Sequence, residues 1–450
     1  MATLTLDGPS AAADVLSTGV STPVVQNMYG GTSKPLISIT SNANSAVSFT
    51  KVNFKIRVDG ELDIASGKTL TLANSYISEN STGLKLTKTG GGTLAFSGSS
   101  STKITFTGGL DMQEGTWIAS QNSSSLPASG WVNFTNSSGT NAKITVNAAS
   151  SIEALAGGNA DSSIDGNSTL TVSGAQITTY GGSIGGSVAL SLSGSGSLAL
   201  TGTNSYSGLT TISAGSLKLG HATNTLAGAI RISGGTLDVD NPDTLGAVTL
   251  TSGTISGDSA LTGTSYAVES GTVSTELSGS GVALAKTTGG TVTLSGTNTY
   301  TGATIVSAGT LLVTGALGAS DVTVNGGTFG GTGTVGGGLD MVGGSFHVAN
   351  LLNPLDVTGI VTIYSGFGID DLAGLNWVSV SNGTYTLING TLGTGVFDSL
   401  ANNSLATAYD LGGGRSAYFE QASLELVVIP EPRTALLGGF GLLALLRRRR

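Results

Sequence analysis

The residues of this chain that could do chemistry are a few groups of acidic side chains. They are Asp238, Asp240 and Asp243 in the segment DVDNPD, Asp161 and Asp165 in GGNADSSIDGN, and the pair Asp370–Asp371. Polysaccharide lyases and glycosidases use carboxylates on one exposed face as acid, base or nucleophile. These groups therefore leave open the alternative that the chain is a carbohydrate-active enzyme.

Two of these segments loosely resemble calcium-binding loops. DVDNPD begins like such a loop, but the twelfth position, where a bidentate Glu is needed, is Thr249. GGNADSSIDGN resembles one calcium-binding nonapeptide, yet it occurs once and without the period of that repeat. Asp and Asn are also common at solvated turns. We favour the turn interpretation and predict no metal ion.

The remaining reactive residue types form no recognisable site. His221 and His347 are far apart in sequence and lack metal-ligand spacing, and the chain has no Cys for a thiolate site. The Gly-rich runs lack the Gly-Lys-[Ser/Thr] of a phosphate loop. Trp117 and Trp131 could stack on sugars, although core packing is commoner for Trp. The sequence therefore predicts no catalytic residue and no cofactor, and we expect the protein not to be an enzyme.

Composition points to an all-β protein. The 450 residues include 71 Gly, which is roughly twice the usual share, with 39% hydrophobic and 10% charged residues. Disorder requires low hydrophobicity and high net charge, and this chain has neither. The net charge is −9, and an acidic, weakly charged chain is poorly suited to neutralise phosphates. Nucleic-acid binding is therefore excluded.

A short phrase recurs through the middle of the chain. Gly-[Ser/Thr]-apolar occurs at a nearly constant step, with Gly at 196, 215, 235, 253, 271, 290, 309, 327 and 344. The apolar residues that follow are Leu198, Leu217, Leu237, Ile255, Val273, Val292, Leu311, Phe329 and Phe346. A repeated step of about 19 residues is typical of one rung of a parallel β-helix with two or three strands per rung. We expect these residues to form an interior ladder, with Gly at the corners.

Two longer phrases strengthen this interpretation. LALTGTNSYSGLTTISAGSLKLG (198–220) aligns with VTLSGTNTYTGATIVSAGTLLVTG (292–315), which places Tyr206 against Tyr300. The segment SGTNTYTG (295–302) resembles the autotransporter-associated β-strand repeat of passenger-type proteins. The resemblance implies a right-handed parallel β-helix and an exported location, and it carries no active-site residues.

The C-terminus has three ordered features. Pro430-Glu431-Pro432 precedes an apolar run, Thr434–Leu446, which ends in Arg447–Arg450. As a helix, this run would cover only about 20 Å, against about 30 Å for a hydrocarbon core. The tail resembles a PEP-CTERM sorting signal. That resemblance implies processing by an exosortase-type transpeptidase, transient inner-membrane contact through 434–446, and delivery to the surface or matrix of a Gram-negative bacterium. The sorting residues it implies are Pro430, Glu431, Pro432, Arg447, Arg448, Arg449 and Arg450.

The N-terminus does not match an export signal. The sequence has no Lys or Arg before Lys34 and no apolar run longer than Ala11–Ala13, whereas a signal peptide has both. The expectation of an export signal in this sequence therefore rests on the C-terminus alone.

These patterns predict five segments. They are an N-terminal cap or edge strands (1–49), degenerate solenoid rungs (50–195), regular rungs (196–349), a β-rich C-terminal cap (350–429) and a sorting tail with a short hydrophobic helix (430–450).

Three functions are compatible with this organisation. The leading hypothesis is an exported, non-catalytic surface or matrix protein that contacts exopolysaccharide or neighbouring copies. The alternative is a polysaccharide lyase or glycosidase, which would require exposed, aligned carboxylates about 5–10 Å apart. A third hypothesis is adhesion through flat arrays of Thr, which would require a regularly spaced Thr face.

Overall fold

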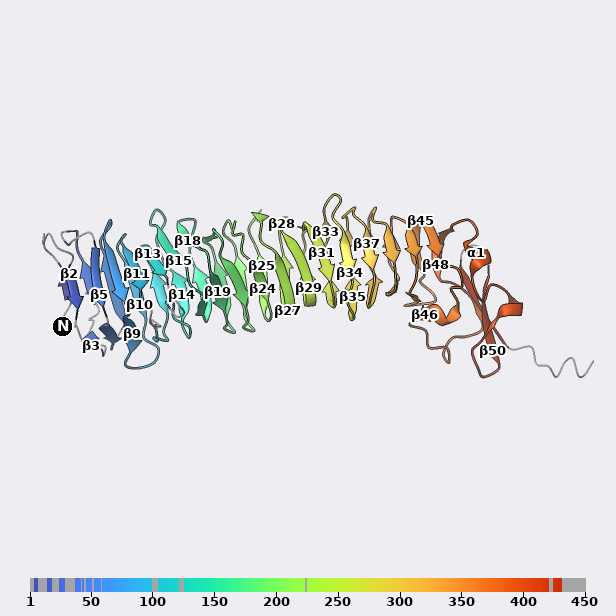
Figure 1. The fold of residues 1–450 in the computed structure, drawn as a ribbon, viewed down its shortest axis with the longest axis horizontal. Helices are drawn as coiled ribbons and strands as arrows, with labels where there is room; N and C mark the ends of the chain where they lie inside the picture. The colour runs from blue at the N-terminus through green and yellow to red at the C-terminus, as the bar shows by residue number, and fades with distance from the viewer. Residues whose placement is uncertain are drawn as a thin grey trace, which may run out of the picture. The chain divides into compact units, whose positions relative to one another are not determined.

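The fold is almost entirely parallel β-structure. The computed structural model describes strands Leu4–Leu6, Asp14–Ser17 and Val24–Met28, and residues 37–430 except 42, 44–45, 51, 58, 99–103, 121–124, 223–224 and 421–423. The chain divides into two compact units, Met1–Ser265 and Tyr266–Arg450. Each unit contains a parallel β-solenoid, so the predicted all-β solenoid is confirmed (Figure 1).

Most regular rungs have three strands, one on each of three parallel faces of the solenoid that we call sheets I, II and III. One regular rung has only two strands, Ser197–Leu200 and Thr210–Ile212. This settles the choice between two and three strands per rung. In the first unit, sheet I contains β1 (Leu4–Leu6), β4 (Ile37–Ile39), β7 (Gly60–Ile64), β10 (Leu86–Thr89), β12 (Leu110–Met112), β14 (Trp131–Phe134), β17 (Ala154–Gly157), β20 (Ile177–Tyr180), β23 (Ser197–Leu200), β25 (Ser216–Leu219) and the second halves of β27 (Ile230–Val239) and β29 (Ala247–Ser256).

The other two sheets of the first unit follow the same order. Sheet II consists of two separately hydrogen-bonded parts. The first contains β2 (Asp14–Ser17), β5 (Ala46–Thr50), β8 (Thr69–Ala73), β11 (Thr93–Ser97), β13 (Gly115–Ala119), β15 (Ala142–Val146), β18 (Ser162–Gly166) and β21 (Ser183–Ile184). The second contains β26 (Thr225–Leu226), β28 (Asp243–Leu245) and β30 (Leu261–Thr262). Sheet III likewise consists of two separately hydrogen-bonded parts. The first contains β3 (Val24–Met28), β6 (Val52–Ile56) and β9 (Tyr76–Glu79). The second contains β16 (Ser150–Ile152), β19 (Thr169–Val172), β22 (Ala189–Leu192), β24 (Thr210–Ile212) and the first halves of β27 and β29.

The second unit repeats the arrangement. Sheet I contains β32 (Gly271–Val273), β35 (Thr291–Leu294), β38 (Thr310–Val313), β41 (Thr328–Gly331), β44 (Ser345–His347) and β46 (Leu372–Ala373). Sheet II contains β33 (Leu277–Ser278), β36 (Thr297–Asn298), β39 (Ala316–Leu317), β42 (Thr334–Val335) and the first half of β45 (Leu355–Ile363). Sheet III contains β31 (Ser265–Val268), β34 (Leu284–Lys286), β37 (Thr304–Val306), β40 (Val322–Val324), β43 (Leu339–Met341) and the second half of β45. The last parallel strand of the solenoid, β48 (Ile388–Leu392), pairs with both halves of β45.

Rung length differs along the first unit. In the long N-terminal rungs, the register partner of Trp117 on the next rung is Ile144. In the regular rungs, Leu198 already meets its partner at Leu217, so one turn of the chain is shorter there. The longer rungs place their extra residues in the connections between strands, where insertions leave the buried ladder intact.

The interior ladder predicted from the repeat is confirmed. Its members in the first unit are register partners from rung to rung: Leu198, Leu217, Leu237 and Ile255. In the second unit they are Val292, Leu311, Phe329 and Phe346. All eight side chains are buried, and each fully buried Leu contributes about 1.5–3 kcal/mol relative to exposure.

One step of the expected ladder is wrong. The register partner of Val273 is Leu294, and Val292 pairs instead with Gly271. The shift is two residues, and side chains alternate between faces with a period of two. Val273 therefore still points inward and is fully buried.

The long repeated phrase forms the same local structure in both units. The buried hydroxyl of Tyr206 lies 2.9 Å from Thr210 Oγ1, and that of Tyr300 lies 2.7 Å from Thr304 Oγ1. Two residues before each Tyr, a buried Asn accepts a hydrogen bond from a backbone N–H of the preceding rung. This shared geometry explains why Tyr206 and Tyr300 align in the sequence.

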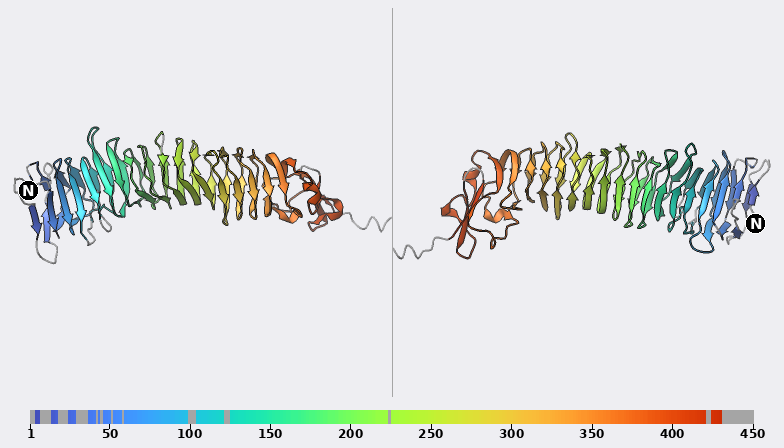
Figure 2. Two further views of the ribbon diagram at one scale, coloured as in Figure 1. Left: turned by 45° about the horizontal axis from the view of Figure 1, so that its top comes forward. Right: turned by 180° about the vertical axis from the view of Figure 1, so that it is seen from behind.

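The second unit ends in an antiparallel sheet. Its strands, in spatial order, are β47 (Gly383–Thr386), β51 (Glu425–Pro430), β50 (Arg415–Glu420) and β49 (Tyr409–Asp410). Short helices η1 (Ile369–Asp371), α1 (Val396–Ser399) and η2 (Leu405–Thr407) connect the strands of this region. Phe367 stacks on Phe419 with ring centroids 6.1 Å apart. The two views in Figure 2 show this sheet at the C-terminal end of the second unit's rungs.

In the described part of the chain, no helix is long and apolar enough to cross a membrane. The predicted hydrophobic helix (434–446) lies outside the described residues.

Candidate functional site

The acidic residues of DVDNPD do not converge. Asp238 and Asp240 lie on the outer face beside Lys218, whose Nζ is 3.5 Å from Asp238 Oδ2 and closer to Asp240. A hydrogen bond from Lys218 to Asp240, followed by the charge of Asp238, raises the pKa of the Lys218 ammonium. Asp243, in contrast, is buried in β28. Exposed ion pairs of this kind contribute little to stability.

The two Asp side chains of GGNADSSIDGN stabilise the local backbone by accepting hydrogen bonds from N–H groups. Asp161 accepts a hydrogen bond from the Gly139 N–H at 2.7 Å. Asp165 accepts one from the Gly166 N–H at 2.7 Å and pairs with Lys143 at 3.2 Å. The backbone hydrogen bond and then Lys143 lower the pKa of the Asp165 carboxyl. Among the described residues, no group of three or more His, Asp or Glu side chains could hold a metal ion.

The remaining candidates, Asp370, Asp371, His221 and His347, lie at separate places and do not form a common site. The Asp371 carboxylate accepts the Gly368 N–H at 2.8 Å and so caps η1, next to Asp370. His221 lies 3.1 Å from the Thr203 hydroxyl in the first unit. His347 follows the buried Phe346 in β44, and its side chain is half-buried on the other face of the strand.

Of the predicted sorting residues, the structure describes only the first, Pro430. Pro430 is the exposed last residue of β51, opposite Arg415 in the neighbouring strand. Glu431, Pro432 and Arg447–Arg450 lie outside the described residues, so their role stays a prediction.

Hydroxyl-bearing residues stack in columns on the outer face of sheet I. Each column consists of the residue that follows the repeat glycine. In the first unit its members are Ser197, Ser216, Thr236 and Thr254. In the second unit they are Thr291, Thr310, Thr328 and Ser345. Neighbouring members are one strand spacing apart, about 4.8 Å, so the spacing that the Thr-array hypothesis requires is present.

The two Trp candidates have different environments. Trp117 is fully buried, donates its Nε1–H to the Ser125 carbonyl at 2.8 Å and packs against Phe96. Trp131 begins β14 on the outer face of sheet I and is 37% exposed. Of these two Trp residues, Trp131 is therefore the one whose side chain is accessible to a ligand.

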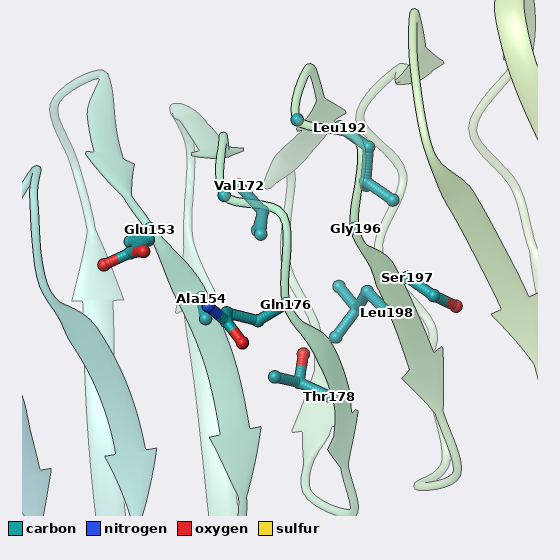
Figure 3. A pocket seen from close by; sticks show the side chains of 11 residues that line it. Glu153, Ala154, Val172, Gln176, Thr178, Leu192, Gly196, Ser197 and Leu198 are labelled. Atoms are coloured by element: carbon teal, nitrogen blue, oxygen red, sulfur yellow. The ribbon is translucent and has the colours of Figure 1, made fainter.

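A small gap lies at the corner where the chain passes from sheet III to sheet I. Its lining includes Glu153, Gln176 and the buried side chains of Thr178 and Leu198, and it has room for about one water molecule. The corner between β16 and β17 is the single residue Glu153, whereas the next rung uses the longer segment 173–176. In Figure 3, the Gln176 side chain extends toward Ala154, while the Glu153 carboxylate points away from Gln176.

Two buried lysines were missed by the sequence analysis. Lys88 Nζ donates to the carbonyls of Thr89 (2.6 Å), Gly90 (2.6 Å) and Glu114 (3.2 Å). Lys286 makes the same kind of contacts, to the carbonyls of Thr288, Gly289 and Ala308. Each Lys occupies an inward position of an alternating strand, followed by a Gly-rich corner. A Lys at an inward position before a Gly-rich corner is therefore the sequence pattern that could have predicted these buried lysines.

Comparison with protein families gives two partial matches. The model of the passenger-associated-transport-repeat family matches residues 190–219, 214–239 and 284–313. The model of the TamB C-terminal domain matches residues 8–195. The passenger-associated repeats fall on the regular rungs from β22 to β27 and from β34 to β38.

Comparison with solved structures gives the Haemophilus influenzae Hap adhesin, at 12% identity and a TM-score of 0.32. The alignment covers 88% of this chain and 64% of the adhesin, so the chain spans less than two thirds of that structure. A search of curated proteins gives no match.

Proposed function

We propose that this chain is an exported, non-catalytic structural or adhesive protein of the bacterial cell surface or extracellular matrix. The observation that supports this most directly is the coincidence between the passenger-associated-transport-repeat matches and the solenoid rungs. In this proposal the rungs form a stiff scaffold whose outer faces present hydroxyl and amide groups to glycans or to neighbouring copies.

The outer surface supports a binding role more than a chemical one. The sheet I columns repeat Ser and Thr hydroxyls at the strand spacing. Three of the candidate carboxylates already accept hydrogen bonds from backbone N–H groups, namely those of Asp161, Asp165 and Asp371. A single lysine, Lys218, forms ion pairs with both Asp238 and Asp240. A lyase or glycosidase requires carboxylates free to contact substrate.

We further propose that the C-terminal tail directs the protein to the surface through an exosortase-type transpeptidase. Pro430 ends β51 at an exposed position. The Pro-Glu-Pro segment therefore begins where the antiparallel sheet ends, which is consistent with access by a processing enzyme. The apolar run 434–446 would contact the inner membrane until processing.

A complementation experiment separates the structural role from the enzymatic alternative. The gene is deleted in the native bacterium, and attachment and matrix cohesion are measured after complementation with the wild-type chain or with Asp238→Asn/Asp240→Asn. We expect both chains to restore cohesion equally, because a scaffold does not need these carboxylates. In parallel, purified wild-type protein is incubated with the native exopolysaccharide, and we expect no new reducing or unsaturated ends.

Two results would contradict the proposal. One is depolymerisation of the exopolysaccharide by the purified wild-type chain. The other is unchanged attachment and cohesion in the deletion strain.

A further inference from the structure

Two successive rungs of the second unit contain the same kind of turn where the chain leaves sheet I. In the first turn, Asn350 Oδ1 accepts the Leu352 N–H at 2.8 Å. In the second turn, Asn376 Oδ1 accepts the Val378 N–H at 3.3 Å. Each Asn follows the last paired position of β44 and β46 by the same number of residues. The two turns therefore start from the same corner of neighbouring rungs.

These turns (349–354 and 375–380), which we call the corner turns, expose apolar side chains. Leu352 is 82% exposed and Val378 is 89% exposed. The half-buried Trp377 precedes Val378. Single exposed apolar residues are common on protein surfaces, but several that lie together mark a contact surface. Neighbouring rungs are one strand spacing apart, about 4.8 Å, so one partner could cover both turns.

The last described residue, Pro430, lies close to the second corner turn. Its register partner in the neighbouring strand β50 is Arg415. The Arg415 guanidinium donates hydrogen bonds to the carbonyls of Trp377 and Val380. One arginine side chain therefore spans the distance from the strand beside Pro430 to the backbone on both sides of Val378.

The sequence after Pro430 provides an apolar partner. The run Thr434–Leu446 has no charged residue and lies between Arg433 and Arg447–Arg450. Burial of apolar surface contributes about 25 cal/mol per Å², so an uncovered run of this kind is unfavourable in water. A segment attached so close to its target has a local concentration on the order of millimolar. The tail is therefore well placed to compete for the corner turns.

Charge favours the tail over a membrane surface as the partner of the corner turns. In residues 232–429 the only Lys or Arg residues are Lys286, which is buried, and Arg415, which contacts the second turn. Exposed carboxylates lie near both turns in sequence, since Asp356 follows the first turn and Asp370 precedes the second. Such a surface repels anionic lipid headgroups and attracts the arginines of the tail.

We infer that the corner turns are a docking surface for this chain's own apolar run, Thr434–Leu446. Leu352 and Val378 pack against the run, and the acidic surroundings of the turns attract the arginines on either side of it. Docking covers the run in water and ends when the run enters a membrane. This contact goes beyond the proposed function, because it does not require the tail to be a sorting signal.

The chain has no Cys, so a pair of introduced cysteines can report this contact. Purified full-length Val378→Cys/Leu443→Cys is oxidised under mild conditions, and the disulfide is detected by intact mass and by electrophoresis without reductant. A disulfide requires two Cα atoms within about 7 Å of each other. We expect an intramolecular disulfide to form in this variant.

A matched control uses Ile360→Cys/Leu443→Cys. Ile360 is 62% exposed and lies in β45, on the same rung as the first corner turn but at its next corner. The disulfide should form at least about tenfold faster with Cys at position 378 than at position 360, because docking raises the local concentration at the turns. Leu352→Cys/Leu443→Cys tests the first corner turn independently and should also react faster than the control.

Two results would overturn the inference. One is a disulfide that links two copies of the chain, which would mean that a second copy covers the turns. The other is an equal rate at both corner turns and at position 360, with unchanged circular dichroism. Either result leaves the proposed surface function intact, since that function fails only if the deletion strain keeps its attachment and cohesion.

Discussion

Lys88 and Lys286 show how a single buried charge is accommodated inside a solenoid. Each ammonium is surrounded by backbone carbonyls of its own corner and of the next rung. A buried cation without partners would be very costly. Here the carbonyls replace water, and the lysine joins two successive rungs.

At the residue scale, Lys88 predicts a pH dependence. Burial lowers the pKa of its ammonium from 10.5 to about 8, while Asp63 and Glu114 act in the opposite direction. Between these pH values the unfolded chain binds more protons than the folded chain, so stability should rise with pH. The full effect of this one group is about 3 kcal/mol.

Urea unfolding of Lys88→Met at several pH values between 7 and 11 tests this. In the variant, the free energy of unfolding should increase less with pH than in the wild-type chain, because the contribution of Lys88 is missing. Lys85→Met is the matched control, because Lys85 is exposed on the same rung. Identical pH profiles for the two variants would contradict the assignment.

At the scale of the element, the corners between sheets III and I decide how rungs can stack. Gly309 occupies one such corner with a φ of 66°. This left-handed conformation disfavours any residue with a Cβ. A Cβ here would also lie 2.5 Å from the Gly290 carbonyl oxygen of the preceding rung, and closer to Lys286 Nζ.

Gly309→Ala should therefore destabilise the second unit by about 1–3 kcal/mol. Gly326→Ala is the comparison in the next corner, where the nearest atom to an added Cβ is Ser307 O at 3.3 Å. That substitution should change stability by no more than about 0.5 kcal/mol. Urea unfolding of both variants measures the difference, and equal losses would refute the role assigned to the corner.

The solenoid could be predicted because its information is local and repeated. The step between Leu217 and Leu237 recurs, and alternation assigns each residue to the interior or exterior. The slip at Val273 could not be predicted, since a two-residue shift leaves the inward pattern unchanged. Of the candidate site, the hydroxyl columns follow from the repeat, because the residue after each repeat glycine recurs at the same register position. The exposure of Trp131 could not be predicted, since it depends on which side chains the neighbouring strands place beside it.

At the scale of the whole molecule, the regular rungs and the tail suggest different parts of one function. The rungs provide repeated outer faces, on which passenger-associated repeats are recognised. The tail, from Pro430 onward, would determine where those faces are displayed. In our proposal, display on the cell surface or in the matrix allows the hydroxyl columns to contact glycans or neighbouring copies.

The most direct test of this account is the intact mass and location of the protein in fractionated native cells. We predict a surface or extracellular form that lacks most residues after about Pro430, and retention of a longer, membrane-associated form when Arg447–Arg450 are replaced by Ser. Full-length protein confined to the cytoplasm in wild-type cells would contradict the central claim of export.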